Sequence, residues 1–355
     1  MATKPLISDY LVPPGYYVRE ALDHYGMTQA ELAERSGRPP QTISEIINAK
    51  KEVTEETAFE LEAVLGTPAH VWLNLECAYR YGLEARRRSE KLTEQAAIAA
   101  EYPYSTLARL GLIPRTRNSE ERVRHLLRFF GVAHLDLVNT SYAAAFQNDH
   151  NRKPSPFSLA AWLRIGERLA EQLPLPHYDK SALLASLPAL RRTTRMAHDI
   201  VTAIREVLGP TGVAFVVAPR LPKTHTNGAT FWHANRPVVL LSLRGVFEDA
   251  LWFSLFHALG HVLLHERSQT FIEGLGAESQ EEVDADRFAW YTLIPEASWR
   301  QFRAADRFDS ESVRMFANEK EISPAVVVGR LIHEDKEFDR YPFLRGMRGK
   351  LAVTP

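Results

Sequence analysis

The chain has 355 residues, of which 45% are apolar and 25% are charged, the composition of a globular protein with two or three domains. Its formal net charge of -1 points to no particular partner, and the single Cys77 excludes an intramolecular disulfide and a four-cysteine metal site. A lone cysteine and the absence of an apolar signal segment in the first 20 residues indicate the cytoplasm. The longest apolar run, around residues 251–264, is too short to span a membrane and predicts a buried helix.

Residues 10–82 predict five short helices. Thr28 and Glu31 have the spacing of a capping box at the start of the second helix, and Gly37 is expected to end it. Pro39 and Pro40 suit the first turn of the third helix. Two short helices joined by a tight turn form a helix-turn-helix, whose second helix lies in the major groove of double-stranded DNA.

Polar side chains of this motif are expected to contact bases or phosphates. Residues 1–82 contain seven basic and twelve acidic residues, whereas DNA-binding domains are usually basic. A helical bundle whose polar face meets solvent or a protein therefore stays open as an alternative. We expect exposed Gln41, Thr42, Ser44 and Asn48 to contact base edges, and Gln29, Arg38, Lys50 and Lys51 to hold phosphates.

The Xre/Cro class of repressors is resembled by residues 27–33, 42–44, 47–48, 57–58 and 65–66. Pro68, residues 72–75 and Tyr79 resemble the HigA-type antitoxin branch of that class. The resemblance implies a homodimer on a palindromic operator, and it leaves open whether a toxin partner exists.

The rest of the chain predicts a helical middle region and a mixed C-terminal domain. Helical patterns lie near residues 119–130, 158–173 and 180–208, and β-branched runs at 213–218, 230–233 and 238–242 predict strands. Further helices are expected over residues 247–266, 279–294 and 324–334. We therefore expect a mainly α protein with a small β-sheet (α+β), divided into a helix-turn-helix domain (1–82), a helical middle region (83–200) and a C-terminal domain (201–355).

His257 and His261 are four residues apart on a predicted helix, so both imidazoles lie on one face and can chelate one ion. On the next helix, Glu282 can supply a third ligand, and Asp286 can bond a ligand histidine from the second shell. Three protein ligands and one open position are typical of a catalytic zinc site. The alternative is a pair of core histidines with satisfied hydrogen bonds. His265 lies about 12 Å along the helix from His257, so it is expected in the second shell or in a structural role.

Residues 253–265, 282–289, 293–295 and 322–331 resemble the ImmA/IrrE metallopeptidase family, over roughly residues 200–335. The resemblance implies a gluzincin-like zinc endopeptidase with one Zn²⁺ per chain. Several members of that family cleave helix-turn-helix repressors.

Ala258 departs from the family pattern His-Glu-x-x-His. In that motif the glutamate accepts a proton from the zinc-bound water and passes it to the leaving amine, which alanine cannot do. The loss of a general base costs about 10²- to 10⁴-fold in rate, so we expect a nearly inactive chain that still binds metal. Neither Glu266 nor Glu273 has a helix position from which to replace it. A natural loss and an introduced Glu→Ala change both fit, and the intact ligand set favours the second.

The sequence favours a DNA-binding transcription regulator with a zinc endopeptidase domain, disabled at Ala258, that acts on a repressor, a partner protein or its own middle region. The alternatives are a non-enzymatic repressor that senses a ligand or a metal, and a HigA-like antitoxin that binds a toxin. Weak candidates for stabilising a transition state are His225, His233 and Tyr291.

Overall fold

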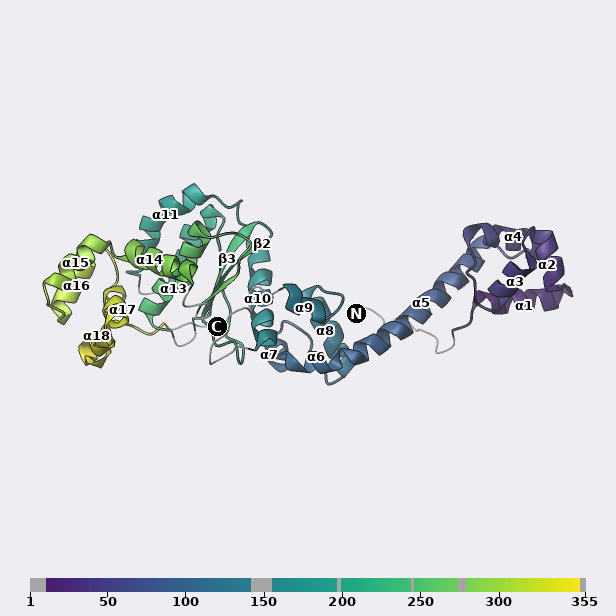
Figure 1. Ribbon diagram of the computed structural model, residues 1–355, viewed down its shortest axis with the longest axis horizontal. Coiled ribbons are helices and arrows are strands. Elements are labelled where there is room, and N and C mark those ends of the chain that lie inside the picture. The colour runs from purple at the N-terminus through teal and green to yellow at the C-terminus, as the bar shows by residue number, and fades with distance from the viewer. Residues whose placement is uncertain (1–10, 142–154, 197–198, 244–245, 274–278, 352–355) are drawn as a thin grey trace. The chain divides into compact units, whose positions relative to one another are not determined.

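The computed structural model describes residues 11–141, 155–196, 199–243, 246–273 and 279–351 (Figure 1). The chain divides into two compact units, residues 1–96 and 97–355. Most of the described residues are helical and four strands form one sheet, which confirms the predicted α+β class. Among the described residues, every helix is too short or too polar to cross a bilayer.

Local signals define the helices of the first unit. Thr28 Oγ1 accepts a hydrogen bond from the Glu31 N–H at 3.2 Å, and Glu31 Oε2 accepts one from the Thr28 N–H at 2.7 Å, which completes the predicted capping box. Gly37 then ends the helix with a φ of +67°, in the left-handed region that favours glycine. The five helices are α1 Pro14–Tyr25, α2 Gln29–Ser36, α3 Pro40–Ile47, α4 Glu55–Leu65 and α5 Ala69–Glu94.

The fifth helix is longer than predicted. It was expected to lie within residues 10–82, but α5 continues through residue 82 to Glu94, so it crosses the domain boundary expected there. Gly82 lies inside α5, where a Cβ atom would sit 2.0 Å from a methyl carbon of Leu11. The glycine therefore makes room for a packing contact and does not end the helix.

The second unit contains the remaining helices and the sheet. The region predicted as one helix over 180–208 forms two helices, and β4 was not predicted. The elements are α6 Ala96–Glu101, α7 Tyr104–Arg109, α8 Ser119–Phe130, α9 Asp136–Ser141, α10 Pro156–Glu171, α11 Lys180–Thr193, α12 Ile200–Leu208, η2 Gly209–Thr211, β1 Ala214–Val217, β2 Gly228–His233, β3 Arg236–Leu241, α13 Glu248–Leu264, β4 Phe271–Ile272, α14 Gln280–Leu293, α15 Glu296–Ala304, α16 Ser310–Glu319, α17 Pro324–Glu334, η3 Lys336–Arg340 and α18 Pro342–Met347.

The sheet has the order β1-β3-β2-β4, with β1 parallel to β3 and β2 antiparallel to both of its neighbours. Successive residues of β3 face opposite sides of the sheet. Val239 and Leu241 belong to the core that contains the apolar residues of α13. Leu240 packs against Gly166 of α10, where a Cβ atom would lie 2.7 Å from a leucine methyl carbon. The sheet therefore lies between α10 and α13 (Figure 1).

The helix α13 is buried along most of its length, as its apolar sequence predicts. Its Gly260 permits close contact with α14, because a Cβ atom there would lie 3.0 Å from the Cα atom of Ala285. This contact places the first two turns of α14 beside the last turns of α13.

Candidate metal centre and nucleic-acid interface

Three side chains with ligand atoms converge where α13 and α14 meet. His257 and His261 come from α13 and Glu282 comes from α14, and one donor atom of each lies within 4.8 Å of the others. The Nε2 atoms of the two histidines are 2.9 Å apart, and Glu282 oxygens lie 3.2 Å from His257 Nε2 and 3.5 Å from His261 Nε2. Ligands about 2.0–2.1 Å from a tetrahedral zinc ion are separated by about 3.3 Å. The donor set and its spacing therefore fit zinc.

The far side of each imidazole is also bonded. His257 Nδ1 lies 2.8 Å from Asp286 Oδ1, the relation expected of a second-shell carboxylate. His261 Nδ1 lies 3.0 Å from His265 Nδ1, so His265 orients a candidate ligand without sharing its ion. The ring of His261 also stacks on Phe271 of β4, with centroids 3.8 Å apart.

The pKa values of the two histidines are shifted in opposite directions. Burial alone would lower the pKa of His257, but hydrogen bonds to Asp286 and Glu282 raise it to about 9. Burial, and then the neighbouring His257 and His265, lower the pKa of His261. The lowered pKa favours the neutral form of His261, whose Nε2 faces the other donors, whereas the raised pKa favours a protonated His257, from which a metal ion must displace a proton.

Ala258 lies beside a small cavity of about 10 Å³ between α13 and the sheet. Glu273, which directly follows β4, reaches this cavity from the sheet side. Its Oε1 atom accepts a hydrogen bond from Ser254 Oγ at 2.6 Å, and burial raises the pKa of its carboxyl. The cavity is lined by Gly228, Ala229, Thr230, Leu241, Ser254, His257, Ala258, His261, Phe271 and Glu273.

Sequence reasoning missed Glu273 and Ser254. It considered only whether Glu273 occupies a suitable helix position, and Glu273 approaches from the sheet. The spacing of Ser254 and Ala258, four residues apart on one face of α13, was the available signal, but nothing in the sequence paired Ser254 with Glu273.

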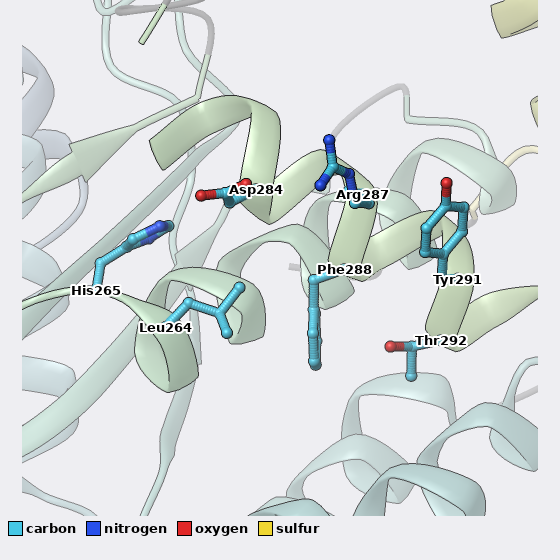
Figure 2. Close-up of a pocket in the computed structure, with 7 residues that line it drawn as sticks. All are labelled: Leu264, His265, Asp284, Arg287, Phe288, Tyr291 and Thr292. Carbon is cyan, nitrogen blue, oxygen red and sulfur yellow. The ribbon is translucent and has the colours of Figure 1, made fainter. Parts of the chain in front are cut away.

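A larger hollow of about 470 Å³ lies beside the metal centre and is separate from it (Figure 2). His265 and Asp284 face one another at one end of this hollow, and Tyr291 lies at the other. His265 lines this hollow and also bonds the candidate ligand His261. The lining residues are Leu264, His265, Asp284, Arg287, Phe288, Tyr291 and Thr292.

The candidates for stabilising a transition state do not join the three ligands among the described contacts. His233 pairs with Glu171 of α10 at 3.0 Å, and Tyr291 lines the larger hollow. His225 is exposed in the loop before β2.

In the first unit, α3 presents a polar face. Gln41 and Asn48 are exposed and Ser44 is half-buried, at helical spacings that place all three on one side. Gln41 Nε2 donates to Glu45 Oε1 at 2.9 Å, and Asn48 Nδ2 donates to the Ser44 carbonyl at 2.8 Å. The face expected to meet base edges is therefore exposed at Gln41 and Asn48, with hydrogen bonds made within the helix.

The structure corrects one expected DNA contact, at Thr42, and leaves the phosphate contact of Arg38 a prediction. Thr42 is only 9% exposed, because it lies on the buried face of α3 with Ile43 and Ile46, so the expectation that it is exposed to bases is wrong. Arg38 is held by Glu60 and Glu56 of α4, each at 2.6 Å, so its charge is already balanced within the protein. Gln29, Lys50 and Lys51 are exposed, as phosphate contacts require.

Comparisons with known proteins match a different family in each of the two units. Residues 18–72 match the helix-turn-helix family, and residues 214–331 match the IrrE N-terminal-like domain of the peptidase class. The uncharacterised HTH-type transcriptional regulator YddM of Escherichia coli K12 is 33% identical over 66 residues, which cover 19% of this chain and 70% of that protein. Two solved structures are also similar to part of this chain. An addiction module antidote protein of a HigA family from Coxiella burnetii is 27% identical, with 24% of this chain and 94% of that chain covered and a TM-score of 0.23. The antitoxin GraA is 24% identical, with 24% of this chain and 95% of that chain covered and a TM-score of 0.24.

The chain therefore belongs to the helix-turn-helix transcriptional regulators through its first unit, and it carries an IrrE N-terminal-like peptidase-family domain in its second.

Proposed function

We propose that this DNA-binding regulator holds one zinc ion in its second unit, in a peptidase-type site whose turnover is slowed by Ala258. The observation that carries the proposal is the convergence of His257, His261 and Glu282 donor atoms at distances that fit a zinc ion. DNA binding follows from the helix-turn-helix family, and the exposed polar face of α3 supports it.

His257, His261 and Glu282 would hold the zinc, which supplies a Lewis acid and an activated water when bound. Asp286 and His265 fix the orientation of the two imidazoles through their Nδ1 atoms. The methyl group of Ala258 cannot accept a proton, so a carboxylate is missing from the helix position next to His257.

The substrate class is a protein or peptide, either a partner regulator or a segment of this chain. On DNA the chain is a homodimer, because one recognition helix covers only one half-site of a palindromic operator.

The test of catalysis is Ala258→Glu in the zinc-loaded protein. Restoring the carboxylate should raise the rate of peptide hydrolysis by about 10²- to 10⁴-fold. Intact mass reports self-cleavage, and quenched fluorescent casein reports cleavage of an unfolded chain. Ala258→Gln is the matched control, because the glutamine amide has about the size of the glutamate carboxylate but accepts no proton at neutral pH. A zinc-loaded Ala258→Glu protein that stays whole and leaves casein intact would contradict the peptidase proposal.

Ala258 also favours a second function, that of a regulator that responds to metal. A site that keeps three ligands but lacks the helix carboxylate can bind metal without hydrolysing a peptide. In that case zinc should change operator affinity by about 5- to 150-fold, the usual range of coupling between two sites. Fluorescence anisotropy with and without zinc measures this change, and His261→Ala should abolish it. Equal affinity in both conditions excludes this function.

A further inference from the structure

The buried carboxylate of Glu273 has one oxygen without a described partner. Its Oε1 atom is bonded to Ser254, but its Oε2 atom is buried and accepts no hydrogen bond from the described residues. An unsatisfied carboxylate oxygen in the interior is costly, so such atoms usually bind a water molecule or an ion.

The position of this carboxylate is set by four contacts. The Glu273 N–H donates to the Gly228 carbonyl at 2.9 Å, and Thr226 Oγ1 donates to the Glu273 carbonyl at 2.8 Å. Ser254 holds Oε1, and a Cβ atom on Gly228 would lie 2.6 Å from Oε2, so only a glycine leaves the carboxylate its place. The backbone and the side chain are therefore both fixed.

Glu273 lines the same cavity as the face of α13 that carries Ala258. Ser254 and Ala258 are four residues apart and share a helix face, and both line the cavity with His257, His261 and Glu273. A volume of about 10 Å³ holds about one water molecule, and this cavity offers that water polar partners on both sides. Glu273 does not belong to the group of donors within 4.8 Å of one another, so it is not one of the three candidate ligands.

We infer that Glu273 replaces the missing helix carboxylate: its Oε2 atom binds one water molecule beside the metal centre and is the proton acceptor for residual hydrolysis. This inference rests on the proposed peptidase site. The water O–H bond breaks, the proton passes to Oε2, and the water oxygen forms a bond with the carbonyl carbon of the peptide. The same proton then passes to the amide nitrogen as the C–N bond breaks, which restores the carboxylate. The gain on Ala258→Glu should then lie near the lower end of its range, because one acceptor is already present.

A crystal structure of the zinc-loaded protein tests the water site without any turnover. We expect one water within about 3.2 Å of Glu273 Oε2, next to the zinc ion. Direct ligation of zinc by Oε2, or an Oε2 atom with no water beside it, overturns the inference.

The second measurement is residual casein cleavage by the zinc-loaded protein, with Ala258→Glu as proof that the probe is cleavable. Glu273→Gln should lower the residual rate by at least about 100-fold while zinc stays at one per chain. Glu266→Gln, an exposed glutamate on the same connection, is the matched control and should change nothing. An unchanged rate in Glu273→Gln, or a wild-type rate equal to that of zinc-free His261→Ala, overturns the role of Glu273 and leaves the zinc site standing. If Ala258→Glu binds zinc but cleaves nothing, the peptidase proposal fails, and with it the role of Glu273 as a proton acceptor.

Discussion

The two units place their functional side chains in opposite environments. In the first unit a small core fixes α3, and the residues expected to meet DNA lie on its exposed face. In the second unit the candidate ligands are themselves almost buried, with His257 7% and His261 2% exposed, and they come from two helices that meet at Gly260. A surface interface depends on local signals that shape one helix, whereas a buried centre depends on how distant segments pack.

The comparison is tested most strongly by removing one core tryptophan from each unit. Trp72 of α5 and Trp252 of α13 are each at most 2% exposed, so either change to Ala should cost about 3–5 kcal/mol. We expect Trp72→Ala to abolish operator binding and keep one zinc per chain. We expect Trp252→Ala to abolish zinc binding and keep operator binding. Circular dichroism melts, zinc content and anisotropy check this. Loss of both activities in each variant would show that the two units do not function separately.

The buried site should respond to pH in a way that the exposed face does not. His257 has a pKa raised to about 9 in the metal-free protein, so at pH 7 zinc must displace its proton. Zinc affinity should therefore fall about tenfold per pH unit from pH 9 to pH 7, with about one proton released per zinc at pH 7. Chelator competition across this range measures the affinity, and calorimetry in two buffers measures the proton. A flat affinity would show that His257 is neutral before zinc binds.

A substitution of Asp286 tests how strongly a residue that bonds a candidate ligand, without binding the ion, affects zinc affinity. Asp286→Asn removes the carboxylate that bonds His257 Nδ1 and should weaken zinc binding by about 10- to 100-fold. Asp284→Asn is the matched control on the same helix, because Asp284 bonds Gln280 and no candidate ligand. Equal losses of zinc affinity in the two variants would show that the effect comes from the negative charge of α14 and not from the hydrogen bond to His257.

The smallest expected effect concerns the exposed face. Gln41→Ala should relax the preference for one base pair per half-site by about 1 kcal/mol or more. Gln29→Ala, expected to lose a phosphate contact, should weaken all sequences alike. Selection from a random DNA pool, followed by anisotropy at fixed salt, separates the two patterns. If both variants lose affinity without a change in preference, Gln41 does not contact a base.

The helices with local start and stop signals were predictable from sequence. The capping box of Thr28 and Glu31, the stop at Gly37 and the start of α17 at Pro324 all lie where the sequence predicts. The buried α13 and the pairing of its histidines with Glu282 also followed from spacing and from apolar patterning.

The features that sequence reasoning missed depend on contacts between distant segments. The strand β4 has two residues, too few to show an alternating pattern, and it forms only against Ala229 and Thr230 of β2. The break between α11 and α12 lies at Thr194, whose Oγ1 atom accepts a hydrogen bond from the Ser323 N–H, 129 residues away. Glu273 reaches the cavity only because β4 pairs with β2.

The most direct test of the account is a count of zinc ions per chain by native mass spectrometry, in the wild type and in His261→Ala. We predict one zinc in the wild type and none in His261→Ala, with both proteins folded by circular dichroism. The same zinc content in the two proteins, whether one or zero, would contradict a zinc centre formed by His257, His261 and Glu282.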